Sequence, residues 1–194
     1  MILATPRPKS VQLLYQEFQE KTLRSKNYLA IHWRYDRQDF VKHCKRSKTP
    51  GNEKPCDEIL SGGFNATLLA VNLGEWLYHK GLEKIIKKVY FAAPPIEGDF
   101  IEKLGEELKQ RFGITTFYGK HIVMFARRKF FDSCGKERYE KQIHDYVSQL
   151  EQEVCLWSSI FLNSQASTWS SSIVQERLVR KLGEHDTLNN IFFK

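Results

Sequence analysis

YLAIHWR, residues 28–34, is an apolar run that ends abruptly in the basic pair His32 and Arg34. A second stretch of this kind lies far along the chain, at residues 160–177, IFLNSQASTWSSSIVQER. It has an apolar run, then a hydroxyl-rich turn, then a helical pattern. Each stretch is typical of a buried strand with polar groups where it emerges. Ligands of open α/β sheets bind outside the carboxyl ends of the strands. The two stretches therefore predict the two halves of one site for a phosphate-bearing ligand, in the manner of a nucleotide sugar.

Helical and strand patterns alternate along the rest of the chain. The alternation favours an α/β fold, a Rossmann-like and mostly parallel sheet with helices on both faces, formed by residues 1–194 as a single domain. Residues 35–62 are polar and punctuated by Pro and Gly, which predicts a long loop. Residues 119–135 fit either a strand or a short helix. The predicted strands are 28–34, 89–93, 115–118 and 159–163, and the predicted helices are about 9–25, 64–77, 100–112, 139–154 and 170–182.

Composition narrows the class of protein. The chain has 194 residues, with 41% hydrophobic and 13% aromatic residues, which is typical of a globular core. Its net charge of +7 permits an anionic partner, but acidic residues are interspersed, so a solvated basic surface is the default interpretation. No apolar run of about 18 residues predicts a membrane span. The N-terminus lacks the apolar region of a secretory signal.

Four cysteines are present, at positions 44, 56, 134 and 155. Cys44 and Cys56 flank a segment rich in Lys, Pro and Gly that a disulfide could close. Four free thiols, as in a cytosolic chain, are the alternative. No CxxC pair or zinc-like Cys/His spacing occurs, so no metal site is expected. Asn65 begins the only N-glycosylation triplet, a weak signal on its own.

The strand ending in His32 and Arg34 offers a phosphate contact. Strand side chains alternate, so His32 and Arg34 point to the same face. A guanidinium binds phosphate oxygens bidentately, and it would stabilise the charge on a departing diphosphate. Two other interpretations stay open: surface residues at a strand exit, or a structural ion pair of Arg34 with Asp36 or Asp39.

The hydroxyl-rich turn, residues 164–172, precedes a predicted helix. A helix N-terminus presents free N–H groups and a positive dipole end, which suits an anion. Ser and Thr also cap helices without any ligand, and this alternative is at least equal. Trp169 could stack on a base or pack in the core. Glu176 and Arg177 could orient the turn or form an ordinary surface pair.

Residues 28–34 resemble the first motif of the GDP-fucose protein O-fucosyltransferases, and residues 151–177 resemble their last motif. The resemblance runs from about residue 28 to residue 180 and is greatest to the branch that modifies thrombospondin-type repeats. It implies a GT-B glycosyltransferase fold, of which this chain resembles only the C-terminal, donor-binding lobe. The N-terminal lobe, with a glycine-rich donor loop and the proposed catalytic base, has no counterpart here.

The resemblance also implies roles for individual residues. Arg34 would contact the diphosphate and act as the catalytic residue. Glu151 stands where the family has an Asp that contacts the nucleotide, and Trp169 stands where it has Phe. Residues 93–95, Ala-Pro-Pro, replace a polar strand end. The implied contacts to GDP-fucose are His32, Trp33, Arg34, Glu151, Ser167, Thr168 and Trp169.

The implied reaction is inverting transfer of fucose from GDP-fucose to a Ser or Thr hydroxyl, without a metal or other cofactor. The acceptor would be a secreted or cell-surface protein, met in the endoplasmic reticulum or Golgi lumen. The alternative is a non-catalytic, degenerate lobe that binds a protein or a glycan. A nucleic-acid-binding domain ranks last, because no face interleaves aromatic and basic residues.

Overall fold

The computed structural model describes residues 7–35, 39–46, 53–134, 136–165 and 167–193. One sheet of five parallel strands lies at its centre, in the order β3-β2-β1-β4-β5. Leu29 of the central strand pairs with Val89 on one side and Ile160 on the other. The predicted α/β fold with a parallel sheet is confirmed. The strands are β1 (Leu29–His32), β2 (Lys88–Ala92), β3 (Thr115–Tyr118), β4 (Ile160–Asn163) and β5 (Glu184–Thr187).

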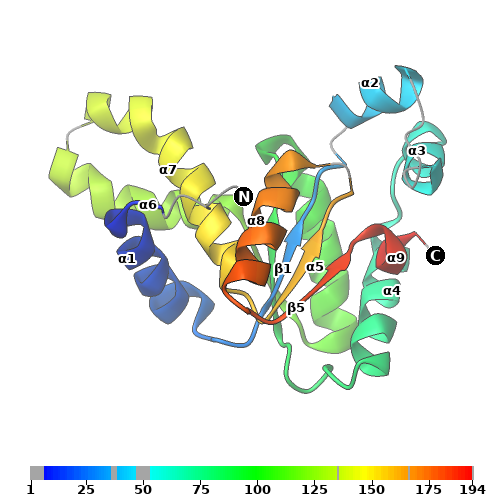
Figure 1. Ribbon diagram of the computed structural model, residues 1–194. Helices are drawn as coiled ribbons and strands as arrows, with labels where there is room; N and C mark the ends of the chain where they lie inside the picture. The colour runs from blue at the N-terminus through cyan, green and yellow to red at the C-terminus, as the bar shows by residue number, and fades with distance from the viewer. Residues whose placement is uncertain (1–6, 36–38, 47–52, 135, 166, 194) are drawn as a thin grey trace.

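Helices cover both faces of the sheet (Figure 1). One face carries α1 (Lys9–Phe18) with the π-helix η1 (Gln19–Leu23), α6 (Gly119–Cys134), α7 (Lys136–Leu156) and α8 (Thr168–Val179). The other carries α4 (Ala66–His79), α5 (Gly98–Phe112), which follows the short η2 (Pro95–Glu97), and α9 (Asn189–Phe192). Two short helices, α2 (Asp39–Arg46) and α3 (Glu53–Leu60), lie beyond the ends of the strands (Figure 1).

Alternation along the strands divides the core into two layers. Leu29 and Ile31 face the layer under α4 and α5, whereas Ala30 faces the layer under α1 and α7. Each layer is built from fully buried side chains of β1, β2 and β4. Burial of one large apolar side chain stabilises the fold by about 1.5–3 kcal/mol, so both layers hold the helices against the sheet.

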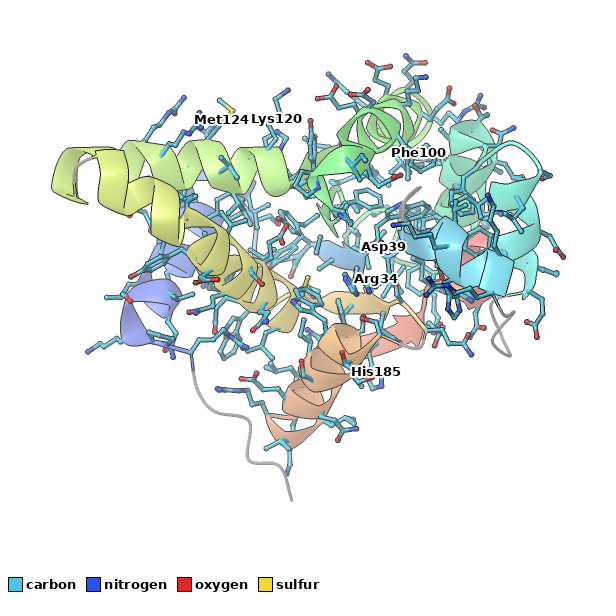
Figure 2. The ribbon with its side chains drawn as sticks, turned by 90° about the horizontal axis from the view of Figure 1, so that it is seen from above. Arg34, Asp39, Phe100, Lys120, Met124 and His185 are labelled. Atoms are coloured by element: carbon cyan, nitrogen blue, oxygen red, sulfur yellow. A yellow bond between two sulfur atoms is a disulfide. The ribbon has the colours of Figure 1, made fainter. Side chains whose placement is uncertain are left out.

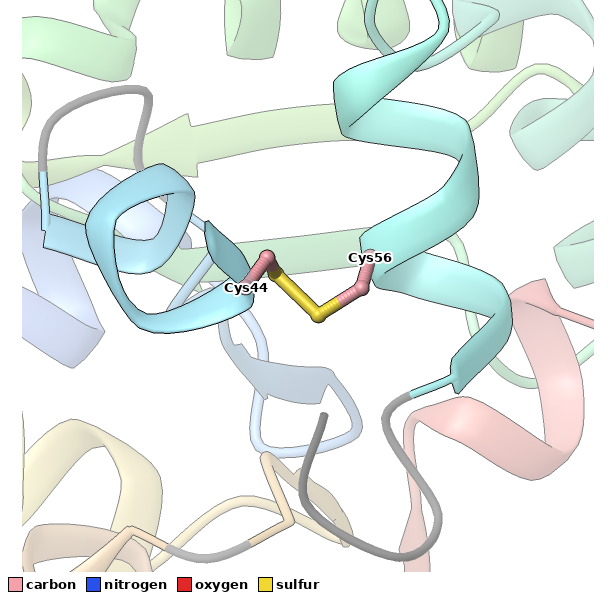
Figure 3. The surroundings of a disulfide bond; sticks show 2 residues. All are labelled: Cys44 and Cys56. Atoms are coloured by element: carbon pink, nitrogen blue, oxygen red, sulfur yellow. A yellow bond between two sulfur atoms is a disulfide. The ribbon is translucent and has the colours of Figure 1, made fainter. Parts of the chain in front are cut away.

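The prediction of a loop over residues 35–62 is wrong in its described parts. Helices α2 and α3 stand there, joined by a disulfide between Cys44 and Cys56 whose Cα atoms are 5.3 Å apart (Figure 3). Phe40 of α2 packs edge-on against Tyr35, with ring centroids 4.8 Å apart. The disulfide contradicts the alternative of four free thiols, while Cys155 is a free, buried thiol.

Other differences are smaller. The ambiguous segment after β3 is the helix α6, and neither β5 nor α9 was expected. The expected strands 89–93, 115–118 and 159–163 are present within one residue of their predicted ends, and the strand expected at 28–34 is shorter, Leu29–His32. Among the described residues, no helix combines the length and apolar character needed to cross a membrane.

Candidate functional site

The strand order places a topological switch point at the carboxyl ends of β1 and β4. From β1 the chain builds outward to β2 and β3 on one side, and β4 and β5 occupy the other side. Open α/β sheets bind ligands in the crevice at such a point. Arg34 lies at this end of the sheet, where it is labelled in the view from above (Figure 2). The two stretches singled out in the sequence therefore meet where the fold favours a ligand.

His32 links the end of β1 to the start of α8. Its Nδ1 atom lies 2.6 Å from Oγ of Ser170, and that oxygen also accepts the backbone N–H of Ser164 at 3.2 Å. The Ser164 hydroxyl in turn donates to the carbonyl of His32. The Trp169 ring packs on the imidazole with centroids 4.3 Å apart. The polar groups at this strand end thus satisfy one another in a closed network.

The imidazole of His32 is neutral at physiological pH. Burial lowers the pKa of His32 to about 3, and the positive charge of Arg34 acts in the same direction. A neutral imidazole can donate or accept one hydrogen bond at each nitrogen but adds no positive charge. Any charge that this strand end offers to a phosphate therefore comes from Arg34.

The guanidinium of Arg34 is exposed to solvent. Asp39, one of the two carboxylates expected as its partner, lies 3.5 Å from Lys42, and no ion pair joins Asp39 to Arg34 within the described residues. Asp36, the other expected partner, lies outside those residues. An exposed arginine at a strand end suits an incoming anion.

The hydroxyl-rich turn divides into structural and accessible groups. Ser167 is the N-cap of α8, where its Oγ accepts the backbone N–H of Ser170 at 3.3 Å. The capping interpretation is thereby confirmed for Ser167, which is buried. Thr168 is exposed and Trp169 is half-buried, so both present part of their surface to solvent.

Trp33 is placed differently from the expectation. Its ring is fully buried in the layer on the other face, stacked on Phe100 with centroids 5.3 Å apart. The indole N–H has no hydrogen-bond partner among the described residues. The Trp33 side chain has no surface to offer a ligand, so the expected contact is corrected to a packing role.

A cavity of about 820 Å³ opens beyond the carboxyl ends of β2 and β3. Its walls combine apolar side chains such as Val123 and Met124 with the cationic side chains of Lys120 and Arg127, all from α6. Lys120 and Met124 are labelled on that helix in Figure 2. The volume is that of a typical small-molecule site. Among the expected contacts only Glu151, from α7, lines the cavity.

Glu151 is a titratable group of this cavity whose pKa is shifted toward neutral pH. The carboxyl is half-buried, and Oε1 accepts the hydroxyl proton of Tyr90 at 2.8 Å. Burial raises the pKa of Glu151 to about 7, while the Tyr90 hydrogen bond opposes the rise. A carboxyl that changes charge near neutral pH in a cavity is a candidate for ligand binding.

Glu176 and Arg177 are both buried, so they do not form a surface pair. Arg177 donates through Nη1 to the carbonyls of Leu156 and Ser158, at 2.5 and 2.8 Å. Glu176 accepts Nη2 of Arg7 at 2.8 Å. The interpretation as a surface pair is wrong, because Arg177 fixes α8 to the end of α7 instead.

No protein-family model and no characterised protein sequence matches this chain. Solved structures do match. Two crystal structures of POFUT1 in complex with GDP superpose with TM-scores of 0.55 and 0.58 at 14% and 15% identity. The apo form of POFUT1 gives a TM-score of 0.56 at 14% identity.

These matches take in 91–93% of this chain and 45–48% of POFUT1, so the chain spans about half the length of the solved structures it matches. POFUT1 is a GDP-fucose O-fucosyltransferase. At this identity the likeness establishes the fold. The chain thus has the α/β fold of about half of the O-fucosyltransferase POFUT1.

Proposed function

We propose that this chain is the donor-binding part of a GDP-fucose-dependent protein O-fucosyltransferase. The observation that carries the proposal is the convergence of Arg34, Thr168 and Trp169 on the switch point, at the same end of the sheet as the cavity. The fold likeness to GDP-bound POFUT1 supports the nucleotide-sugar class. The sequence motifs at residues 28–34 and 151–177 also support it. They lie far apart in the sequence, and the fold brings them to the same end of the sheet.

In this proposal the base enters the cavity toward Glu151 and the diphosphate reaches Arg34. As the bond between fucose and the diphosphate breaks, negative charge develops on the departing GDP. The guanidinium of Arg34 stabilises that charge more than it stabilises the ground state, which accelerates transfer. Thr168 and the free face of Trp169 complete the contacts to the nucleotide.

The fucose is transferred with inversion to a Ser or Thr hydroxyl of a secreted or cell-surface protein. The family resemblance places the base that accepts the hydroxyl proton in an N-terminal lobe, so this chain supplies the donor half of the reaction. The proposal assigns no metal or other cofactor. The Cys44–Cys56 disulfide supports an oxidising compartment, such as the lumen of the endoplasmic reticulum or Golgi.

Calorimetric titration of the purified chain with GDP tests the proposal, with UDP and ADP as controls for the base. We expect saturable binding that is selective for GDP. Arg34→Ala should weaken it about tenfold to a hundredfold, the range for a lost hydrogen bond to a charged group. Arg111→Ala is the matched control, since Arg111 is an exposed arginine paired with Glu107 at the far end of α5. Unchanged GDP affinity in a folded Arg34→Ala variant would remove the site assignment.

A non-catalytic binding module is the second candidate. Two observations favour it: the Glu that replaces the family's Asp at position 151, and the burial of Trp33 away from the site. Cooperative thermal unfolding would show that the chain is folded. If the folded chain does not bind GDP at millimolar concentration, this second candidate is supported.

A further inference from the structure

The hydroxyl of Tyr90 forms one hydrogen bond among the described residues. Its partner is Glu151, a residue of the candidate site. The ring is fully buried in the middle of β2, in the layer beneath α1 and α7. Its hydroxyl donates to Oε1 of Glu151 at 2.8 Å. Burial raises the pKa of Tyr90 well above its usual range, so the hydroxyl keeps its proton and remains a donor.

The geometry makes this bond a directional support. Strand β2 is paired on both sides, with β1 and β3, so the Tyr90 hydroxyl is a fixed point toward which one carboxylate oxygen is held. Gly119 lies on the same side, and a Cβ atom there would stand 3.5 Å from Oε1 of Glu151. The Tyr90 bond uses one of the roughly four acceptor sites of the carboxylate, so both oxygens keep a site for a ligand in the cavity.

The charges around Glu151 come from several elements. Cationic groups from α6 and acidic groups from α5 line the same cavity, and the neighbouring thiol of Cys155 lies on α7 itself. None of these groups is hydrogen-bonded to Glu151 among the described residues, and the bond from Tyr90 is the specific contact. The titratable groups that face the cavity with Glu151 are Lys120, Arg127, Asp99, Glu102 and Tyr118.

We propose that Tyr90 is a positioning residue for nucleotide recognition: it orients Glu151 and favours the carboxylate form that accepts N–H groups of a base. The inference rests on the proposed function, because it assigns the cavity to the base of the donor. A carboxylate accepts two hydrogen bonds from the adjacent N–H groups on the edge of guanine, and uracil and adenine lack that pair of donors. Tyr90 would therefore act on selectivity between bases without touching the ligand.

Tyr90→Phe tests this role through the pH dependence of GDP binding. In the wild type, affinity should rise with pH through about 7, where Glu151 becomes ionised. Loss of the Tyr90 hydrogen bond should move that midpoint upward by about one pH unit and weaken binding at pH 7 about fivefold. The diphosphate of GDP itself titrates near pH 6, and this contribution is the same for all variants. Glu151→Gln shows that contribution alone, because its binding profile should lack the step near pH 7.

Tyr28→Phe is the matched control. It removes another fully buried hydroxyl from the same layer, one that donates to the carbonyl of Val154 at 2.7 Å. We expect it to lower stability but to leave the midpoint of the binding profile in place. If Tyr90→Phe and Tyr28→Phe give the same midpoint, Tyr90 has a packing role and the inference is wrong.

A ligand-free measurement separates this inference from the proposed function. The ¹³C shift of the Glu151 carboxyl, followed by NMR against pH, reports its ionisation directly. A midpoint that rises in Tyr90→Phe supports the positioning role, and an unmoved midpoint overturns it. A wild type that binds no GDP would refute the proposed function and the ligand part of the inference, while the NMR result would still decide whether Tyr90 controls Glu151.

Discussion

The Nδ1 atom of His32 lies 2.6 Å from Oγ of Ser170, which bonds the last residue of β1 to the first turn of α8. The same serine oxygen accepts the N–H of Ser164. One hydroxyl thus joins the two strand ends between which the candidate site lies. This hydroxyl adds to the pairing of β1 with β4 and to the bond from the Ser164 hydroxyl to the carbonyl of His32.

Ser170→Ala should lower the free energy of unfolding by about 1–3 kcal/mol, because it leaves the buried groups of His32 and Ser164 without a partner. Urea denaturation at neutral pH measures the loss. Ser172→Ala, an exposed serine of the same helix, serves as the control and should change stability by less than about 0.5 kcal/mol. Equal losses in the two variants would contradict the linking role of Ser170.

His32 should make stability depend on pH. Its pKa is about 3 in the folded chain against a usual value of 6.5, so the unfolded chain binds a proton in this interval that the folded chain does not. The free energy of unfolding that the chain has above pH 6.5 therefore decreases as the pH falls from 6.5 toward 3, by roughly 1.4 kcal/mol per pH unit. His32→Gln should flatten the slope measured by urea denaturation between about pH 4 and 6.

His185 provides the comparison for that slope, because it is an exposed histidine on the edge strand β5. We expect His185→Gln to retain the wild-type dependence. If the pH dependence of stability survives in His32→Gln and disappears in His185→Gln, it arises from His185, and the prediction for His32 is wrong.

Arg177→Met should be among the most damaging single changes. The guanidinium is fully buried and donates to backbone carbonyls at the end of α7 and at the start of β4 and β5, which methionine cannot serve. We expect a loss of about 3 kcal/mol or more in thermal or urea unfolding. Arg111→Met removes an exposed arginine and should cost no more than about 1 kcal/mol. A mild effect of Arg177→Met would show that water replaces the guanidinium.

The disulfide should stabilise the pair of helices beside Arg34. Its loop is short, so replacing Cys44 and Cys56 with Ala should lower the free energy of unfolding by about 2–3 kcal/mol. Denaturation with and without a reducing agent measures the effect. The double variant should be insensitive to the reductant, and a wild type that is equally insensitive would contradict a formed disulfide.

The sheet could be predicted from the sequence because its inner strands are locally distinctive. Leu29, Val89 and Ile160 each stand in short runs rich in apolar, β-branched or aromatic residues, which is what a strand buried on both faces requires. The edge strand β5 reads Glu-His-Asp-Thr and carries no such signal, so only pairing with β4 reveals it. Helices α2 and α3 were hidden by their shortness and by the Pro and Gly residues around them.

The candidate site was predictable in part. Exposure of Arg34 at a strand end follows from a local pattern, and so does the capping serine Ser167. The partnership of Tyr90 with Glu151 joins residues that the sequence gives no reason to pair, since each lies in an ordinary strand or helix. The sequence leaves open whether Arg177 orients the turn or forms a surface pair, because nothing near it in the sequence shows that the end of α7 lies within its reach.

The central position of β1 also shapes how this chain folds. Leu29 and its partner Ile160 lie far apart in the sequence, and Ile160 is synthesised long after Leu29. The edge of β1 that pairs with β4 therefore stays unpaired until β4 has been synthesised, and contacts between such distant residues form slowly. During that interval the exposed edge of β1 is a place where a chaperone would be needed and where aggregation would begin.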